Sequence, residues 1–360
     1  DERKLLENIR AVGDAFNDSP KYYEHKTKAL RRLPKLLKEK VCLIVLDDVW
    51  SVEQVAPLRN ALGERCRLLF TTREGSAVSD VGAIELSVDV LSESDAKALL
   101  ADWFAATGKP LPTEAIEVAK LCGNLPFTLA LCGAVARDGQ PWRDILDALL
   151  DADHQFIERR FPDYPFPDAL RAMRASVDML GRENATAVDR YHELAVFLLH
   201  PVSEEAVVTF WCRENVCSAR NARKLLTILA RKSLLSLQGE APKRLVVLHD
   251  LQRDYLRLIT DDYEVQSLNS LVLKNYRKRC PRGWASGPDD GYFFQMLPPH
   301  LIIAGKRKEL HRLLLNPVWI LTVLKTTSAG WLIASYDLPP GDIDERIIRQ
   351  ALAMSQWVLD

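Results

Sequence analysis

Two adjacent carboxylates, Asp47 and Asp48, are the residues of this sequence best suited to chemistry. They follow the apolar run CLIVL at 42–46, and such runs are typical of buried parallel strands. Ligands of open α/β sheets bind at the carboxyl ends of the strands. We therefore expect Asp47 to hold Mg²⁺ with its water shell, and Asp48 to orient or deprotonate an attacking water. The alternative is a pair of loop aspartates that only end a strand.

A second polar tip, Thr71, Thr72 and Arg73, follows the apolar run CRLLF. A guanidinium at the end of the next strand can contact a terminal phosphate and report whether it is present. Arg73 is therefore a candidate phosphate sensor. An ordinary surface arginine after a strand fits the same pattern.

Two further candidates lie later in the chain, in GNLPFTLAL and LHD. Gly123 is expected to end one helix and Pro126 to open the next, and the flat proline ring can pack against an adenine. His249 follows an expected strand, and Asp250 is expected to be the N-cap of the next helix. The alternatives are a plain helix–helix corner and a structural histidine.

The elements that position these residues form an α/β pattern followed by helices. AIELSV at 83–88 is a third candidate strand, and alternation with helices predicts a parallel sheet. From Ser92 to about Lys232 we expect helices and no strand. SLLSL and RLVVL then predict a hairpin, and helices before a hairpin are typical of a winged helix. We expect four domains, at 1–90, 91–160, 161–262 and 263–360, with a boundary in the proline-rich stretch HQFIERRFPDYPFPDALRAM.

Composition narrows the class of protein. The 360 residues are 48% hydrophobic and 27% charged, with a formal net charge of -1, so no overall attraction to nucleic acid or an anionic membrane is indicated. The seven cysteines show no zinc or Cys-x-x-Cys spacing, which favours a reduced, cytoplasmic compartment. The apolar runs are too short to span a bilayer. A start without Met suggests a fragment.

The order of these motifs resembles a known family. CLIVLDDVW, LLFTTR, CGNLPFTLAL and LHDLQRDYL occur as in NB-ARC proteins, a branch of the STAND class of P-loop ATPases. That branch includes apoptotic protease-activating factors and plant disease-resistance proteins. The segment DDGYFFQMLPPHLIIAG resembles the second helical domain of the apoptotic-factor subgroup, which usually precedes WD-type repeats.

The resemblance implies a nucleotide-binding α/β domain, a helical domain, a winged helix and an α-superhelical domain. It implies that Asp47 and Asp48 are the Walker B pair and that Arg73 senses phosphate. It further implies that Pro126 packs on the base and that His249 contacts the β-phosphate of ADP in a closed state. The implied cofactors are ADP or ATP and Mg²⁺.

The sequence departs from the family pattern in two places. No GxxxxGK[ST] loop occurs in the 360 residues, and the resemblance implies that it precedes Asp1. The motif usually written GLPL is Asn-Leu-Pro-Phe at 124–127, and we expect Phe127 to share the cofactor contact with Pro126.

These features favour a switch in apoptosis-like or innate-immune signalling that exchanges ADP for ATP, self-associates on activation and hydrolyses ATP slowly. Signalling domains are the other expected partners, and a membrane or nucleic acid is not. One alternative is a nucleotide-free scaffold of the same architecture. Another is a winged-helix DNA-binding regulator, because five basic residues cluster around one expected helix: Arg220, Arg223, Lys224, Arg231 and Lys232.

Overall fold

The fold is known from a computed structural model, which describes residues 2–23, 25–49, 51–72, 81–105, 110–151, 167–197, 201–212, 217–241, 243–338 and 343–359. These residues divide into two compact units, which we call the first and second units. The first unit is Asp1–Val88 with Ala351–Asp360, and the second is Asp89–Gln350. The predicted boundary stretch HQFIERRFPDYPFPDALRAM spans 154–173, of which 154–166 lie outside the described residues. Its last residues, 167–173, belong to the helix Pro167–Glu183. The four-domain division stays a prediction.

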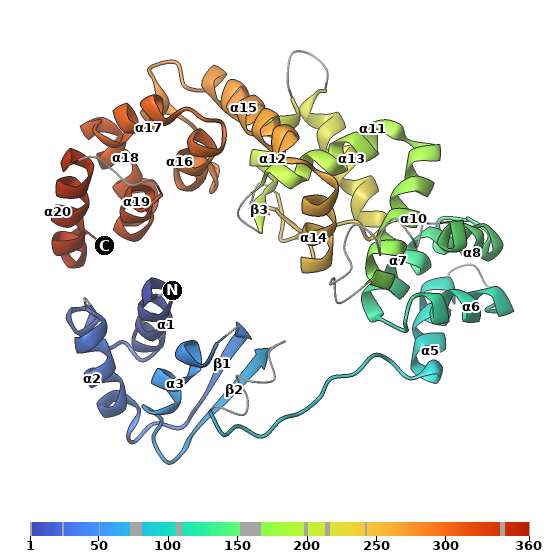
Figure 1. The fold of residues 1–360 in the computed structure, drawn as a ribbon, viewed down its shortest axis with the longest axis horizontal. Helices are drawn as coiled ribbons and strands as arrows, with labels where there is room; N and C mark the ends of the chain where they lie inside the picture. The colour runs from blue at the N-terminus through green and yellow to red at the C-terminus, as the bar shows by residue number, and fades with distance from the viewer. Residues whose placement is uncertain are drawn as a thin grey trace. The chain divides into compact units, whose positions relative to one another are not determined.

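The first unit contains a two-stranded parallel sheet and the helices beside it. The elements of this unit are α1 (Glu2–Ala15), η1 (Pro20–Tyr22), α2 (Lys26–Leu37), β1 (Cys42–Val49), α3 (Val52–Arg59) and β2 (Cys66–Thr72). β1 pairs with β2 in register from Cys42 opposite Cys66 to Leu46 opposite Phe70, and Figure 1 shows the two arrows side by side. The parallel pairing that the sequence predicts is therefore present.

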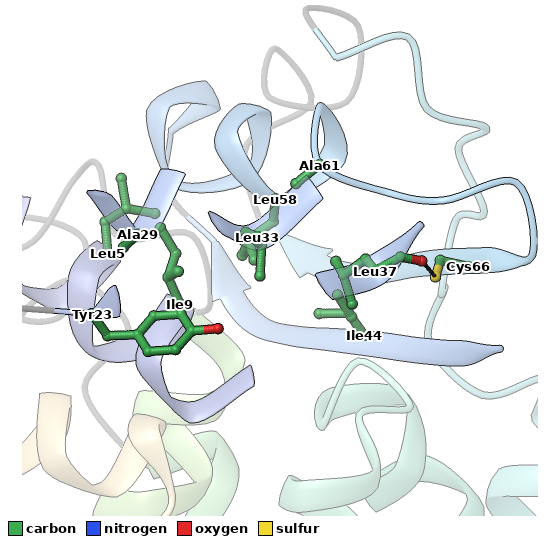
Figure 2. Close-up of a cluster of buried hydrophobic side chains, with 10 residues drawn as sticks. All are labelled: Leu5, Ile9, Tyr23, Ala29, Leu33, Leu37, Ile44, Leu58, Ala61 and Cys66. Atoms are coloured by element: carbon green, nitrogen blue, oxygen red, sulfur yellow. Dashed lines mark hydrogen bonds between the residues drawn. The ribbon is translucent and has the colours of Figure 1, made fainter. Parts of the chain in front are cut away.

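One face of this sheet is covered by helices and forms the core of the first unit. Ile44 of β1 and Cys66 of β2 pack with Leu33 and Leu37 of α2, and Figure 2 shows these side chains converging from the different elements. The thiol of Cys66 also lies 3.5 Å from the carbonyl oxygen of Leu37. Apolar residues at i and i+4 on α2 therefore seal one side of the sheet.

The other face of the sheet is exposed, which corrects the expectation that these apolar runs form buried strands. Leu43, Val45 and Leu69 are 60%, 56% and 55% exposed. Side chains alternate along a strand, so the residues next to the buried ones point to the opposite face. No described element of the first unit covers that face. The continuous apolar run gives both faces the same character, and only the tertiary structure shows which is covered.

The predicted third strand at 83–88 is wrong: these residues form no strand in the described chain. Ile84, Leu86 and Val88 are 99%, 86% and 91% exposed. A strand needs a neighbour to complete its backbone hydrogen bonds, and none of the described residues offers one to this segment. Alternation of apolar residues in the sequence is therefore not sufficient to predict a strand at 83–88.

The second unit is mainly helical. Its first four helices are α5 (Glu93–Phe104), α6 (Thr113–Leu121), α7 (Pro126–Arg137) and α8 (Trp142–Asp151). α7 packs against both α5 and α10 (Pro167–Glu183). A Cβ added to Gly133 of α7 would come within 2.7 Å of the Trp103 ring of α5, so glycine permits the close approach of these two helices.

A small antiparallel sheet lies further along the second unit. It has the order β3 (Val202–Ser203), β5 (Leu245–Val247), β4 (Ser236–Gln238). The pairing of β4 with β5 confirms the predicted hairpin. β3 corrects the expectation of no strand before Lys232. Two residues are too few for a periodic signal, and only their pairing with β5 makes them a strand.

Helices flank this sheet on both sides in sequence. Before and within it come α11 (Ala185–His192), η3 (Glu193–Val196), α12 (Glu204–Trp211) and α13 (Ala219–Arg231). After it come α14 (Asp250–Ile259), α15 (Asp262–Lys278), η4 (Trp284–Ser286), α16 (Phe293–Ile303), α17 (Arg307–Leu314), α18 (Pro317–Thr326), α19 (Ala329–Tyr336) and α20 (Ile343–Leu359). The mostly helical second half of the chain agrees with the sequence pattern.

The core of the later helices includes a buried polar cluster around His300. Its ring nitrogens lie 2.9 Å from Tyr292 Oη and 2.5 Å from Asn269 Oδ1. Burial lowers the pKa of His300 to about 3. This histidine is therefore neutral and structural. Among the residues that the structure describes, no helix is long and apolar enough to cross a membrane.

Candidate functional site

The turn between α6 and α7 holds the motif that contains Pro126. Gly123 and Asn124 have φ of 60° and 51°, a left-handed backbone that glycine adopts freely and asparagine tolerates. The Thr128 hydroxyl donates to the carbonyls of Cys122 and Leu125, at 2.9 and 2.8 Å. The replacement of the usual glycine by Asn124 is thus physically compatible with this turn.

Pro126 and Phe127 stand at the first turn of α7. Leu125 is the N-cap and Pro126 the first helical residue, where its missing N–H costs nothing and its fixed φ suits the helix. Pro126 is exposed and Phe127 half-buried, while the following residues from Thr128 are buried against the core. The helix start therefore presents a proline ring and a phenyl ring on a rigid support.

His249, and not Asp250, is the N-cap of α14, which corrects the sequence expectation. The backbone of His249 is extended, its Nδ1 accepts a hydrogen bond from the Leu251 N–H at 3.2 Å, and its own N–H donates to Gln252 Oε1 at 2.8 Å. Asp250 is instead the first helical residue and forms an ion pair with Arg253. A carboxylate there interacts favourably with the helix dipole.

The structure brings two predicted site residues together. The rings of Phe127 and His249 stack, with centroids 4.5 Å apart and planes inclined by 19°. One ring belongs to α7 and the other caps α14, so the stack joins two motifs that are distant in sequence. Pro126 precedes Phe127, which places it in the same corner of the second unit.

The capping contact also determines which nitrogen of His249 carries the proton. A neutral imidazole has one donor and one acceptor nitrogen, and Nδ1 is the acceptor for the Leu251 N–H. In the neutral ring, this contact places the proton on Nε2. An N–H donor in that position suits a phosphate oxygen, because hydrogen bonds to anionic acceptors are short and strong.

In the first unit, Asp47 lies at the carboxyl end of the sheet. Its Oδ1 accepts a hydrogen bond from Thr71 Oγ1 at 2.5 Å, across from β2 to β1. Asp47 lies within β1 and not after it, because the strand continues to Val49 through a register shift after Leu46. The backbone of Asp48 is in the same strand, but its side chain lies outside the described residues, as does Arg73.

The described oxygen donors at Asp47 can be compared with the ligands that Mg²⁺ prefers. Among the described residues, no cluster of three or more His, Cys, Asp or Glu side chains can hold a metal. Asp47 and the Thr71 hydroxyl are hard oxygen donors, and Asp47 is exposed. Mg²⁺ keeps several waters and takes one or two carboxylates together with substrate phosphates. These two donors suit a magnesium ion that is also held by water and phosphate.

A comparison with known protein families gives a match over the region that contains Asp47 and Thr71. Residues 2–107 match the family described as the NB-ARC domain. This region is therefore similar to NB-ARC domains. The matched segment includes Asp47, Asp48 and Arg73.

Similar proteins extend the comparison beyond the NB-ARC region. Apoptotic protease-activating factor 1 of Danio rerio is 27% identical over 316 residues, covering 85% of this chain and 23% of that protein. Its Homo sapiens counterpart is 26% identical over 312 residues, 85% of this chain and 24% of that protein. A probable disease resistance protein of Arabidopsis thaliana is 25% identical over 289 residues, 75% and 29% respectively. The chain thus spans roughly a quarter of the length of these relatives.

Two features near these motifs, at Gln252 and Asn124, were not expected from the sequence. Gln252 closes a capping box with His249, and its Nε2 donates to the Ser233 carbonyl at 2.7 Å. A glutamine three residues after an N-cap is a sequence signature of this box, so it was detectable. Among the residues that the structure describes, none gives the buried Asn124 Oδ1 a hydrogen bond. No sequence signal identifies it, because its burial depends on packing around the turn.

Three of the five basic residues expected to favour DNA binding form ion pairs within the chain. Arg223 pairs with Glu204 and Glu205 at 3.7 and 3.1 Å. Arg231 lies 3.0 Å and Lys232 3.4 Å from Asp138. Paired cations neutralise fewer phosphates, so the helix α13 of this NB-ARC-like chain is a weak candidate for a DNA-reading surface.

Proposed function

We propose that this chain is the regulatory core of an ADP/ATP-gated signalling switch that self-associates on activation, in apoptosis-like or innate-immune signalling. The NB-ARC match of residues 2–107 supports nucleotide dependence. The names of the similar proteins, an apoptotic protease-activating factor and a disease resistance protein, support the biological setting.

The Phe127–His249 stack is the observation that carries the proposal. In the proposed closed state Pro126 packs on the adenine, and the Nε2–H of His249 donates to the β-phosphate. Both contacts need α7 and the start of α14 to stay in one corner, and the stack at 4.5 Å holds them there. The helical domain and the winged helix of the proposed architecture would then close together on ADP.

Gating follows from differential binding. A contact made in the closed state and lost in the open state shifts their ratio by its own free energy. A hydrogen bond from His249 to a charged phosphate contributes about 1.5–3 kcal/mol, which corresponds to roughly 10- to 150-fold in the ratio. Exchange for ATP would remove this bias and permit self-association.

The residues of the first unit would serve the terminal phosphate. We propose that Asp47, with the Thr71 hydroxyl, orients the water shell of Mg²⁺, and that Mg²⁺ when bound supplies positive charge to the phosphates. Asp48 would accept the proton of the attacking water, and Arg73 would contact the terminal phosphate. Hydrolysis on such a switch would be slow.

The test is ADP release from the full-length protein carrying His249→Ala. We expect faster release by about 10- to 150-fold and a larger oligomeric fraction without activator. Two controls separate binding from folding. Gln252→Ala opens the capping box but keeps the ring, and His25→Ala removes an exposed histidine that caps α2 without a side-chain hydrogen bond.

Equal losses of melting temperature with and without ADP, together with an unchanged ADP off-rate, would contradict the gating role. Absence of measurable ADP binding to the full-length protein would instead favour the nucleotide-free scaffold. Salt-dependent, nanomolar binding to duplex DNA would favour the winged-helix regulator.

A further inference from the structure

A strongly basic cleft lies between the end of α15 and the start of α17, away from the residues of the proposed switch. It has a volume of about 920 Å³, within the range of small-ligand sites. Its lining includes five cationic side chains: Arg277, Lys306, Arg307, Lys308 and Arg312. The whole chain has a formal net charge of -1, so this concentration of positive charge is local and not a consequence of composition.

One carboxylate faces these cations, and other contacts already engage it. Glu309 Oε1 accepts from Trp284 Nε1 at 2.8 Å and lies 3.8 Å from Arg277 Nη1. Within the described part of the chain, Lys306, Arg307, Lys308 and Arg312 have no ion pair. The cleft therefore keeps a large excess of uncompensated positive charge.

The walls of the cleft are held in place by packing. The Arg277 guanidinium lies over the Trp284 ring at 4.5 Å from its centroid, and Trp284 is buried. On the other wall, Gly305 has φ of 71°, and the Lys306 N–H donates to the Leu301 carbonyl at 2.8 Å. This left-handed helix end fixes where α17 begins, and so fixes the cations at its start.

The charge arrangement is unfavourable without a partner. Lys308 and Arg312 are four residues apart on α17, so they lie on one face, where like charges repel. Lys306 occupies the N-cap position, and an ammonium group has no acceptor for the first N–H groups of the helix. The positive end of the helix dipole adds to the same field. A bound anion would relieve all of these costs together.

We propose that this cleft binds a small molecule carrying several phosphate groups. Arginine forks match phosphate oxygens in bidentate pairs, and lysines add point charges. A concave cleft with cations on two facing walls suits a compact ligand, whereas nucleic-acid binding requires an extended basic stripe. The proposal is independent of the ADP/ATP switch, because it uses none of the same residues.

The test is calorimetric titration of the whole 360-residue chain with inositol hexakisphosphate and with inorganic tripolyphosphate at fixed salt. The test variant is Lys308→Gln with Arg312→Gln. The matched control is Lys278→Gln with Arg257→Gln, which removes the same charge from exposed positions outside the cleft. We expect micromolar binding by the parent chain, at least about tenfold weaker binding by the test variant, and unchanged binding by the control.

Further readouts keep the result interpretable if a variant is unstable. Without ligand, the test variant should melt no lower than the parent, because it loses a repulsive pair. With ligand, only the parent and control should gain melting temperature. An ATP titration separates a nucleotide from a non-nucleotide polyphosphate as the source of the phosphates. Equal weakening in test and control variants overturns the proposal, as does binding of polyglutamate or duplex DNA without binding of either polyphosphate.

Discussion

The Phe127–His249 stack predicts a measurable coupling free energy between two motifs. We would replace Phe127 by Leu, the residue usual in this motif, and His249 by Asn, and combine the two. Leu keeps apolar volume but removes the ring, and Asn is a good N-cap, so the cap of α14 survives. The double-mutant cycle then isolates the ring–ring contact from the loss of the cap.

The geometry sets the size of the expected coupling. Centroids 4.5 Å apart with planes inclined by 19° correspond to a stacked pair, and such pairs contribute about 0.5–1.5 kcal/mol beyond area burial. Phe127 is half-buried and His249 exposed, so we expect the lower half of that range, about 0.5–1 kcal/mol.

The assay is urea unfolding of the whole chain, parent and three variants, with each transition followed by tryptophan fluorescence and circular dichroism. If the two probes give separate transitions, the cycle is evaluated only on the transition of the second unit, which contains both Phe127 and His249, because a single unfolding free energy requires two-state behaviour. A coupling within about 0.3 kcal/mol of zero, the usual limit for independent sites, would refute the stack. A large loss in the His249→Asn variant alone would show that Asn fails as the cap.

Three other predictions follow from single features. The pKa of His300 in the folded chain lies below its unfolded value of about 6.5, so protonation of the unfolded chain lowers the stability as pH falls below that value. The variant His300→Gln should therefore lose about 2 kcal/mol less stability than the parent between pH 7 and pH 5. Identical profiles of stability against pH for parent and variant would contradict this. In the full-length protein, Asp48→Asn should slow ATP hydrolysis roughly 10²-fold while nucleotide binding is retained. Asp47→Asn should instead weaken the magnesium dependence of nucleotide binding. A hydrolysis rate equal to that of the parent would contradict the role of Asp48, and an unchanged magnesium titration would contradict that of Asp47. The double variant Leu43→Thr, Val45→Thr should bind less of a hydrophobic dye and self-associate less than the parent, because both side chains lie on the exposed sheet face. Its free energy of unfolding should change by less than about 0.5 kcal/mol. A loss above about 2 kcal/mol would mean that this face is covered in solution.

Several parts of the fold followed from local patterns. The parallel pairing of CLIVL with CRLLF, the break before Pro126 and the hairpin of β4 and β5 were all predictable. Each rests on a short-range cause: strand-length apolar runs, a proline that suits a helix start, or turn residues between two strands. The third strand at 83–88 failed because strand formation needs a partner, and a partner is a property of the whole sheet.

The features of the candidate site also divide into those that the sequence determines and those that only the tertiary structure determines. The sequence by itself determined the residue types suited to phosphate and Mg²⁺, their order along the chain and the family that they resemble, because these depend only on residue identities and spacing. Only the tertiary structure decided that His249 caps α14, that its ring stacks on Phe127, and that Asp47 accepts from Thr71. It also decided that Arg231 and Lys232 pair with Asp138 while the cations of α17 face an open cleft. Pairing, stacking and burial depend on which distant segments meet, and no local pattern encodes that.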